Sequence, residues 1–145
     1  MPLEVQLEDV VEEFRVGSEP QAVIRFRRKN AGHVEDSIQD ATDAKGAVDP
    51  QRLGEALWGR LIVGWSGIVD GKGQAVPFEA PADVVARVLA RAKDRGEKAV
   101  ESDLQRRAQG AWVYAVIRGF PPKVKGELQS RTNADDAEVT AALGN

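Results

Sequence analysis

The sequence of 145 residues contains no cysteine, one histidine and one tyrosine. Without cysteine, the chain can form neither disulfides nor thiolate nucleophiles nor cysteine-based metal sites. The single histidine, His33, excludes a histidine-rich metal site as well. A general base needs an orienting partner and a group to act on, and the sequence offers few candidates for either. We therefore expect a non-enzymatic protein with neither a metal nor a cofactor.

The chain also lacks a long hydrophobic run. Uncharged stretches such as residues 61–69 are far shorter than the ~20 residues that span a bilayer. The first ten residues, MPLEVQLEDV, show no basic region followed by an apolar core, so they are not a secretory signal. We expect a protein that makes no membrane contact and resides in the cytoplasm.

Charge is balanced in total but uneven along the chain. The formal net charge is -3, which argues against a general polyanion binder. Residues 1–50 carry six basic and eleven acidic groups, whereas residues 51–122 carry eleven and eight. Such asymmetry is typical of an interaction surface. One expectation is self-association, in which the acidic N-terminal segment of one copy meets a basic surface around residues 87–98 of another.

The first part of the chain predicts a β hairpin. Residues 3–14 fit a strand or a helix, and we expect a short strand or extended arm followed by one or two helical turns. Residues 17–20, Gly-Ser-Glu-Pro, have turn chemistry. Residues 21–28 then alternate as a half-buried strand that pairs with residues 14–16. Its apolar face comprises Ala22, Ile24 and Phe26.

The same strand carries a basic cluster. Arg25, Arg27 and Arg28 with Lys29 suggest a nucleic-acid surface, but no glycine-aromatic RNA motif accompanies them. The simpler interpretation is that these arginines lie on the solvated face and meet the acidic first dozen residues. Nucleic-acid binding stays an alternative.

Apolar periodicity predicts several helices after the hairpin. A short amphipathic helix is expected over residues 33–44, with His33 as a surface or capping residue. Asp49 and Pro50 form an N-cap followed by proline at the first helical position. This second helix is expected to continue through Gly64, which would place Trp58 and Trp65 on one side of it.

Two more helices are expected further on. One begins near Pro81 and ends at Gly96, and a long one covers residues 97–118 before Gly119-Phe120-Pro121-Pro122 stops it. Gly110 inside the long helix indicates close helix packing. The inward face of that helix is expected to comprise Val100, Leu104, Ala108, Ala111, Trp112 and Ala115.

Residues 70–73, Asp-Gly-Lys-Gly, could be interpreted as a calcium-binding or a phosphate-binding loop. A calcium loop needs further oxygen ligands and a closing glutamate, which are missing. A phosphate loop needs a G-x-x-x-x-G-K-[ST] spacing, which is also missing. Asp-Gly between two short apolar pairs is a tight-turn signal instead, with residues 68–76 as a second β element.

These patterns predict a mainly α protein with a small β hairpin element, an α+β fold of four to five helices. Residues 1–122 form the single expected domain, and residues 123–145 a polar C-terminal tail with a short helix at 135–143. The expected core comprises Trp58, Leu61, Trp65, Val85, Leu89, Leu104 and Trp112.

The central stretch resembles the small tail assembly chaperones and related minor tail components of long-tailed bacteriophages and prophages. Those proteins carry a hydrophobic–Gly-Trp-x-Gly–hydrophobic pattern, then Asp, one or two Gly, Pro-Phe and a helix. Here the pattern runs through Val63-Gly-Trp-Ser-Gly-Ile-Val-Asp70, Gly71, Gly73 and Val76-Pro-Phe78. The resemblance covers about residues 22–92, and the long helix that follows departs from the family.

The resemblance implies a non-catalytic protein of the host bacterial cytoplasm that coats a long helical tape-measure protein during virion assembly. A tail component that stays in the particle is an alternative. An amphipathic surface can shield the apolar stripe of another helix. The residues expected to bind the partner lie around the Asp-Gly turn: Ile68, Asp70, Val76, Pro77 and Phe78. Alternatively, Pro77 and Phe78 simply seal the core.

Overall fold

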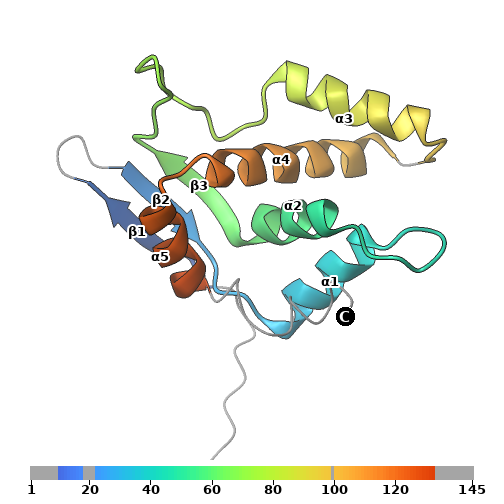
Figure 1. Ribbon diagram of the computed structural model, residues 1–145, viewed down its shortest axis with the longest axis horizontal. Coiled ribbons are helices and arrows are strands. Elements are labelled where there is room, and N and C mark those ends of the chain that lie inside the picture. The colour runs from blue at the N-terminus through green and yellow to red at the C-terminus, as the bar shows by residue number, and fades with distance from the viewer. Residues whose placement is uncertain (1–9, 18–21, 99, 133–145) are drawn as a thin grey trace, which may run out of the picture.

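In the part of the chain that the structure describes, the computed structural model shows a three-stranded antiparallel sheet and five helices (Figure 1). The structure describes residues 10–17, 22–98 and 100–132. The predicted α+β class is therefore confirmed. In chain order the elements are β1 (Glu12–Val16), β2 (Ala22–Phe26), α1 (Ala31–Ala41), α2 (Pro50–Leu61), β3 (Ile62–Ser66), α3 (Ala82–Asp94), α4 (Glu101–Arg118) and α5 (Pro122–Thr132).

The sheet has β2 at its centre, with β1 and β3 antiparallel to it on either side. Ile24 lies opposite Phe14 on β1 and Trp65 on β3. The predicted hairpin and the alternation of β2 are confirmed, since Ile24 and Phe26 are buried and Arg25 is exposed. Residues 12–16 are a strand, so helical turns are absent there. The expected arm over residues 3–9 lies outside the described residues.

Two helix starts follow from local capping. Asn30 Oδ1 accepts a hydrogen bond from the His33 amide at 2.8 Å, and the His33 ring Nδ1 accepts one from the Asn30 amide at 3.2 Å. His33 thus acts as the predicted capping residue of α1. Asp49 accepts hydrogen bonds from the amides of Gln51 and Arg52, with Pro50 at the first position of α2. The predicted N-cap is confirmed.

The second helix ends three residues earlier than expected. α2 stops at Leu61, and Ile62 is already extended at the start of β3. Two adjacent β-branched residues, Ile62 and Val63, favour the strand, and the open edge of β2 supplies hydrogen-bond partners. Trp58 and Trp65 therefore belong to different elements, although both are buried.

The helices form a stack in which α4 lies between α2 and α3, and α1 packs on the far side of α2 (Figure 1). α2 and α4 approach closely at two glycines. A Cβ built on Gly110 would lie 2.6 Å from the Glu55 carbonyl oxygen, and one built on Gly59 would lie 2.9 Å from the Gly110 Cα. The close packing predicted at Gly110 is confirmed.

The buried face of α4 differs from the predicted one. The helix begins at Glu101, and its buried residues include Val113 and Ile117, while Val100 and Ala115 are exposed. α4 contacts α2 on one side and α3 on another, so no single apolar stripe fixes its orientation. On α3, Leu89 is 39% exposed and does not join the core. The other expected core residues Val85, Leu104 and Trp112 are half-buried.

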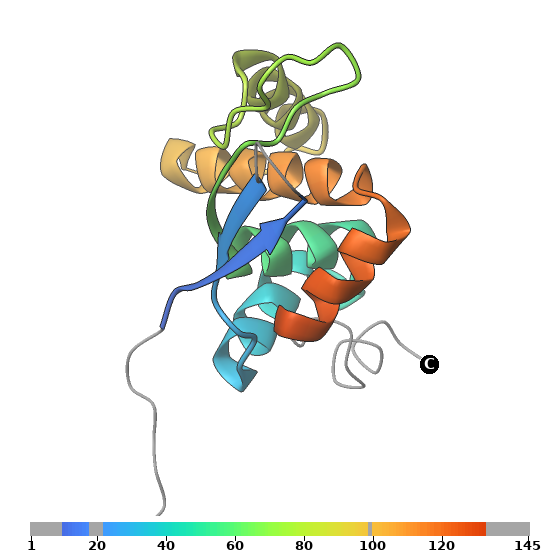
Figure 2. The same ribbon diagram turned by 90° about the vertical axis from the view of Figure 1, so that its left-hand side faces the viewer.

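Part of the expected C-terminal tail belongs to the folded core, because residues 122–132 form the helix α5. α5 lies against the sheet and helices (Figure 2), and its Leu128 is fully buried with Phe14 and Ile24 in one cluster. The Lys29 amide also donates a hydrogen bond to the Thr132 carbonyl at 2.8 Å. Only every third or fourth residue of this polar helix touches the core, which explains why the apolar pattern is weak. The helix expected at residues 135–143 lies outside the described residues.

Candidate functional site

The segment between β3 and α3, residues 67–81, projects from the body at the α3 side of the molecule (Figures 1 and 2). Its tip is the Asp-Gly turn. Asp70 Oδ1 accepts hydrogen bonds from the amides of Lys72 at 2.8 Å and Gln74 at 3.0 Å. Val69 and Ala75 form an antiparallel bridge below the turn. The predicted tight turn is confirmed.

Two tryptophans fasten this projecting segment to the domain. Trp65 Nε1 donates a hydrogen bond to the Val76 carbonyl at 2.9 Å, and Trp112 Nε1 donates one to the Pro77 carbonyl at 2.9 Å. The Trp65 and Phe78 rings meet edge to face, with centroids 4.9 Å apart. Each indole N–H is thus satisfied while its ring packs, the usual arrangement of a buried tryptophan.

Gln109 of α4 holds the end of the segment. Its Nε2 donates to the Phe78 carbonyl at 2.7 Å, and its Oε1 accepts from the Ala80 amide at 2.9 Å. The Gln109 side chain thus forms two hydrogen bonds to the loop backbone, as a neighbouring strand would, because an amide offers a donor and an acceptor together. The loop is therefore held by residues of two elements, Trp65 of β3 and both Gln109 and Trp112 of α4.

The five residues expected to bind a partner all belong to this loop, but they differ in exposure. Ile68, Val76 and Phe78 are half-buried and pack against the core cluster. Asp70 and Pro77 are exposed. Val69 of the loop is a large apolar side chain that is 59% exposed, and it was not among the five expected residues. Figures 1 and 2 place this loop at the α3 side of the body.

The basic strand residues are partly neutralised. Arg28 Nε donates to Glu12 at 2.7 Å, and this hydrogen bond raises the pKa of Arg28. The simpler interpretation, arginines facing the acidic N-terminal segment, is confirmed for this pair. Arg25 is exposed on the solvated face of the sheet, and Arg27 is half-buried.

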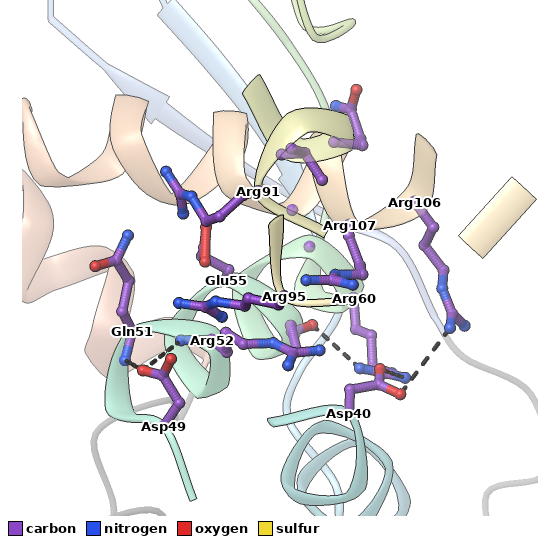
Figure 3. A pocket seen from close by; sticks show the side chains of 15 residues that line it. Asp40, Asp49, Gln51, Arg52, Glu55, Arg60, Arg91, Arg95, Arg106 and Arg107 are labelled. Atoms are coloured by element: carbon purple, nitrogen blue, oxygen red, sulfur yellow. Dashed lines mark hydrogen bonds and ion pairs between the residues drawn. The ribbon is translucent and has the colours of Figure 1, made fainter. Parts of the chain in front are cut away.

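A second candidate site, not identified from the sequence, is a pocket of about 170 Å³ between α2, α3 and α4 (Figure 3). Arginine dominates its lining. The six arginines come in pairs from three helices or their ends: Arg52 and Arg60, Arg91 and Arg95, Arg106 and Arg107. The carboxylates in the lining are Asp40, Asp49 and Glu55.

Four of these arginines form ion pairs. Arg60 donates to Asp40 of α1 at 2.6 Å, and Arg107 to Glu97 at 2.6 Å. Arg52 lies 3.6 Å from the same Glu97 carboxylate, and Arg106 lies 3.7 Å from Asp103. The hydrogen bond from Arg107 is the main reason that the pKa of Glu97 is lowered.

The other two arginines of the lining, Arg91 and Arg95, lie at the solvent-exposed opening of the pocket. Within the described part of the chain, Arg91 and Arg95 have no side-chain hydrogen bond or ion pair, and both are exposed. Glu55 faces them from α2 (Figure 3). Burial raises the pKa of Glu55, while the positive charge of Arg91 opposes that rise. The half-buried Glu55 carboxylate therefore lies near the positive charge of Arg91 without forming an ion pair with it.

The pocket floor is made of small or apolar residues, Ala56, Gly59, Val88 and Gly110. Unpaired guanidinium groups over such a floor can bind an anionic group by charge-assisted hydrogen bonds. The i,i+4 spacing of Arg91 and Arg95 was visible in the sequence. Their convergence with α2 and α4 depends on how the helices pack, so no local pattern could have shown it.

No cluster of three or more metal-ligating side chains occurs among the residues that the structure describes. In the same residues, no helix combines the length and apolarity needed to cross a bilayer. Neither protein-family models, nor curated proteins, nor solved structures give a match to this chain.

Proposed function

We propose that this chain is a non-catalytic bacteriophage or prophage tail assembly protein, a chaperone that binds the tape-measure protein in the host bacterial cytoplasm. The observation that carries the proposal is the projecting loop of residues 67–81. Two residues of the resembling pattern fix this loop, since Trp65 donates a hydrogen bond to the Val76 carbonyl and Asp70 closes the turn. Trp112 and Gln109 of α4, which lie outside the resemblance, hold its other end. A pattern that maintains a rigid, projecting loop is typical of a binding element.

The loop supports binding of an apolar partner surface. Val69 and Pro77 are exposed, and Ile68 lies half-buried near them. The turn is closed by Asp70, so the loop loses little conformational freedom when a partner binds. An amphipathic helix from a long tail protein is a partner of matching chemistry, because its apolar stripe needs cover before the tail tube assembles.

The residue chemistry supports binding rather than catalysis. The only histidine caps α1, and burial raises the pKa of Glu55, whose side chain makes no hydrogen bond to any residue that the structure describes. General acid–base work requires such a partner.

The proposal is tested by capturing the tagged chain from cells that express the surrounding gene cluster, at low and at high salt. We expect one long, helix-rich protein to be retained at high salt, because apolar contacts do not weaken with ionic strength. Val69→Asp should reduce the retained amount about tenfold or more, since one buried charge without a partner costs several kcal/mol at an interface. Val69 is 59% exposed and does not belong to the core cluster or to the partly buried hydrophobics packed against it, so the variant should stay folded.

Val100→Asp is the matched control. Val100 is equally exposed, at 61%, but lies at the start of α4, away from the loop (Figure 1). Equal loss in both variants would contradict the proposed surface. Nucleic acid released by salt as the sole ligand would favour the alternative of a regulatory module using Arg25, Arg27 and Arg28. Mass spectrometry of purified particles separates a chaperone, which is absent from them, from a structural tail component.

A further inference from the structure

We infer that the arginine pocket between α2, α3 and α4 is a second binding site, which accepts a carboxylate side chain presented by a partner protein. The pocket lies toward the C-terminal end of α3, whereas the projecting loop precedes the start of that helix (Figure 1). The two surfaces are thus distinct. This inference does not depend on the proposed role of the loop.

The charges in the pocket leave a net positive centre. Six arginines face three carboxylates in the lining. Asp40 is engaged by Arg60, and Asp49 accepts the backbone amides at the start of α2. Glu97, just outside the pocket, occupies Arg107 and Arg52. The guanidinium groups of Arg91 and Arg95 are available to a ligand, because neither forms a hydrogen bond or ion pair with a described residue.

The paired arginines supply rigidity to the site. Arg52, Arg60 and Arg107 have side chains that are 23%, 21% and 24% exposed, and each is held by a carboxylate. A guanidinium fixed in this way presents its remaining N–H groups without further loss of side-chain entropy. The pocket walls are therefore preorganised, and only the two arginines at the mouth have to order when a ligand binds.

Size favours a single side chain over a larger molecule. Drug-sized ligands occupy pockets of roughly 300–1,000 Å³. The space here, about 170 Å³, suits one carboxylate with its methylene groups. The methylenes would contact Ala56, Val88 and the glycine floor, while the carboxylate reaches the guanidinium groups.

The surroundings argue against nucleic acid as the ligand. A phosphate backbone needs a row of cations along a surface. Here carboxylates that pair with the pocket arginines surround it: Asp40 on α1, Glu97 before α4 and Asp103 on α4. A single carboxylate can enter between these groups, whereas a polyanion would be repelled by them.

Glu55 gives the site a distinctive response to pH. It is faced by Arg91 from α3, by Arg107 from α4, and by Asp49 and Arg52 from its own helix. A bound carboxylate adds a second negative charge beside Glu55, which favours its protonated form. Ligand binding should therefore be accompanied by proton uptake and should strengthen as the pH falls from neutral.

The test is an NMR titration that follows the Nε–Hε signals of the arginine side chains. The probe is a capped hexapeptide of alternating glutamate and alanine, with the glutamine-alanine peptide as its neutral counterpart. We expect the glutamate peptide alone to shift the Arg91 and Arg95 signals. The double variant Arg91→Ala, Arg95→Ala should weaken binding about tenfold or more, because two charge-assisted contacts are lost.

Two further variants separate a ligand site from a structural ion-pair cluster. Arg87→Ala removes an exposed arginine of α3 that does not line the pocket, and it should leave binding unchanged. Glu55→Gln should tighten peptide binding at pH 7 roughly threefold and abolish its pH dependence, because the competing charge is removed. A purely structural cluster would show no such gain.

Several results would overturn the inference. Equal shifts with the glutamine peptide would exclude carboxylate recognition. Tighter binding of inorganic phosphate or of a short DNA duplex, sensitive to the double variant, would assign the pocket to phosphate instead. Sedimentation showing a dimer that depends on Arg91 and Arg95 would replace the partner protein with a second copy of this chain.

Discussion

At the scale of single residues, folding shifts the pKa values of two glutamates in opposite directions, according to the partners of each. Glu97 receives a hydrogen bond from Arg107, which lowers its pKa. Glu55 has no such bond, and burial raises its pKa. The two carboxylates belong to one region of the molecule, yet one should stabilise the folded state at neutral pH and the other should destabilise it.

Glu97→Gln is predicted to lower stability at pH 7 by about 1 kcal/mol, the usual scale for a partly exposed ion pair. A pKa lowered by folding contributes stability that is present above the ordinary value near 4.5 and is lost as the pH falls through the folded-state value. Urea unfolding between pH 7 and pH 3 measures this contribution. The wild type and the variant should converge in acid, and a constant difference at every pH would contradict the assignment.

Glu55→Gln is predicted to change stability in the opposite direction. A carboxyl whose pKa is raised by folding loses stability as the pH rises through that value, so the ionised form costs stability at pH 7. The glutamine variant should therefore be more stable than the wild type at pH 7. The same unfolding series tests it, and a loss of stability would mean that Arg91 and Arg52 attract the charge more strongly than burial opposes it.

At the scale of elements, the contact between α2 and α4 is set by glycine. Gly110 and Gly59 bring the two backbones together, and the floor of the arginine pocket lies at this crossing. Glycine inside a helix costs about 1 kcal/mol relative to alanine when nothing else intervenes. Here the close approach outweighs that cost.

Gly110→Ala is predicted to destabilise the protein by about 1–3 kcal/mol despite its better helix propensity, because the new methyl group overlaps the Glu55 carbonyl. Gly126→Ala in α5 is the control, since nothing lies within 4 Å of its added Cβ. That variant should gain about 0.5–1 kcal/mol. Thermal unfolding followed by circular dichroism distinguishes the two signs, and stabilisation by both changes would contradict the close crossing.

At the scale of the whole molecule, one core joins the sheet, the helix stack and α5. Leu128 of α5 is buried with Phe14 of β1 and Val113 of α4. Chain segments more than a hundred residues apart thus share contacts, which is the condition for cooperative unfolding of a small domain.

Leu128→Ala is predicted to cost about 2–5 kcal/mol, the usual range for a leucine truncated in a packed core. Unfolding should still occur in one step. Far-ultraviolet circular dichroism and tryptophan fluorescence measured against urea should give coincident curves for both proteins. A separate early transition would mean that α5 is attached to, rather than part of, the core.

Local chemistry was sufficient to predict several features from the sequence. The caps at Asp49 and His33, the turn at Asp70 and the hairpin of β1 and β2 depend on neighbours within a few residues, so their patterns are visible in the chain. For the same reason, the five predicted loop residues were placed together correctly on one segment. Their individual exposure was not predictable, because Trp112 and Gln109 reach the loop from α4, about thirty residues further along the chain.

The remaining features were decided by contacts between distant segments. Residues 62–66 become a strand because the edge of β2 is available to pair with them. α5 is stable because the sheet presents a buried face, although its own sequence is polar. The arginine pocket exists because glycine lets α2 and α4 meet while α3 brings Arg91 and Arg95 alongside. Sequence by itself determined turns, caps and strand alternation, and tertiary structure decided which charges would face one another.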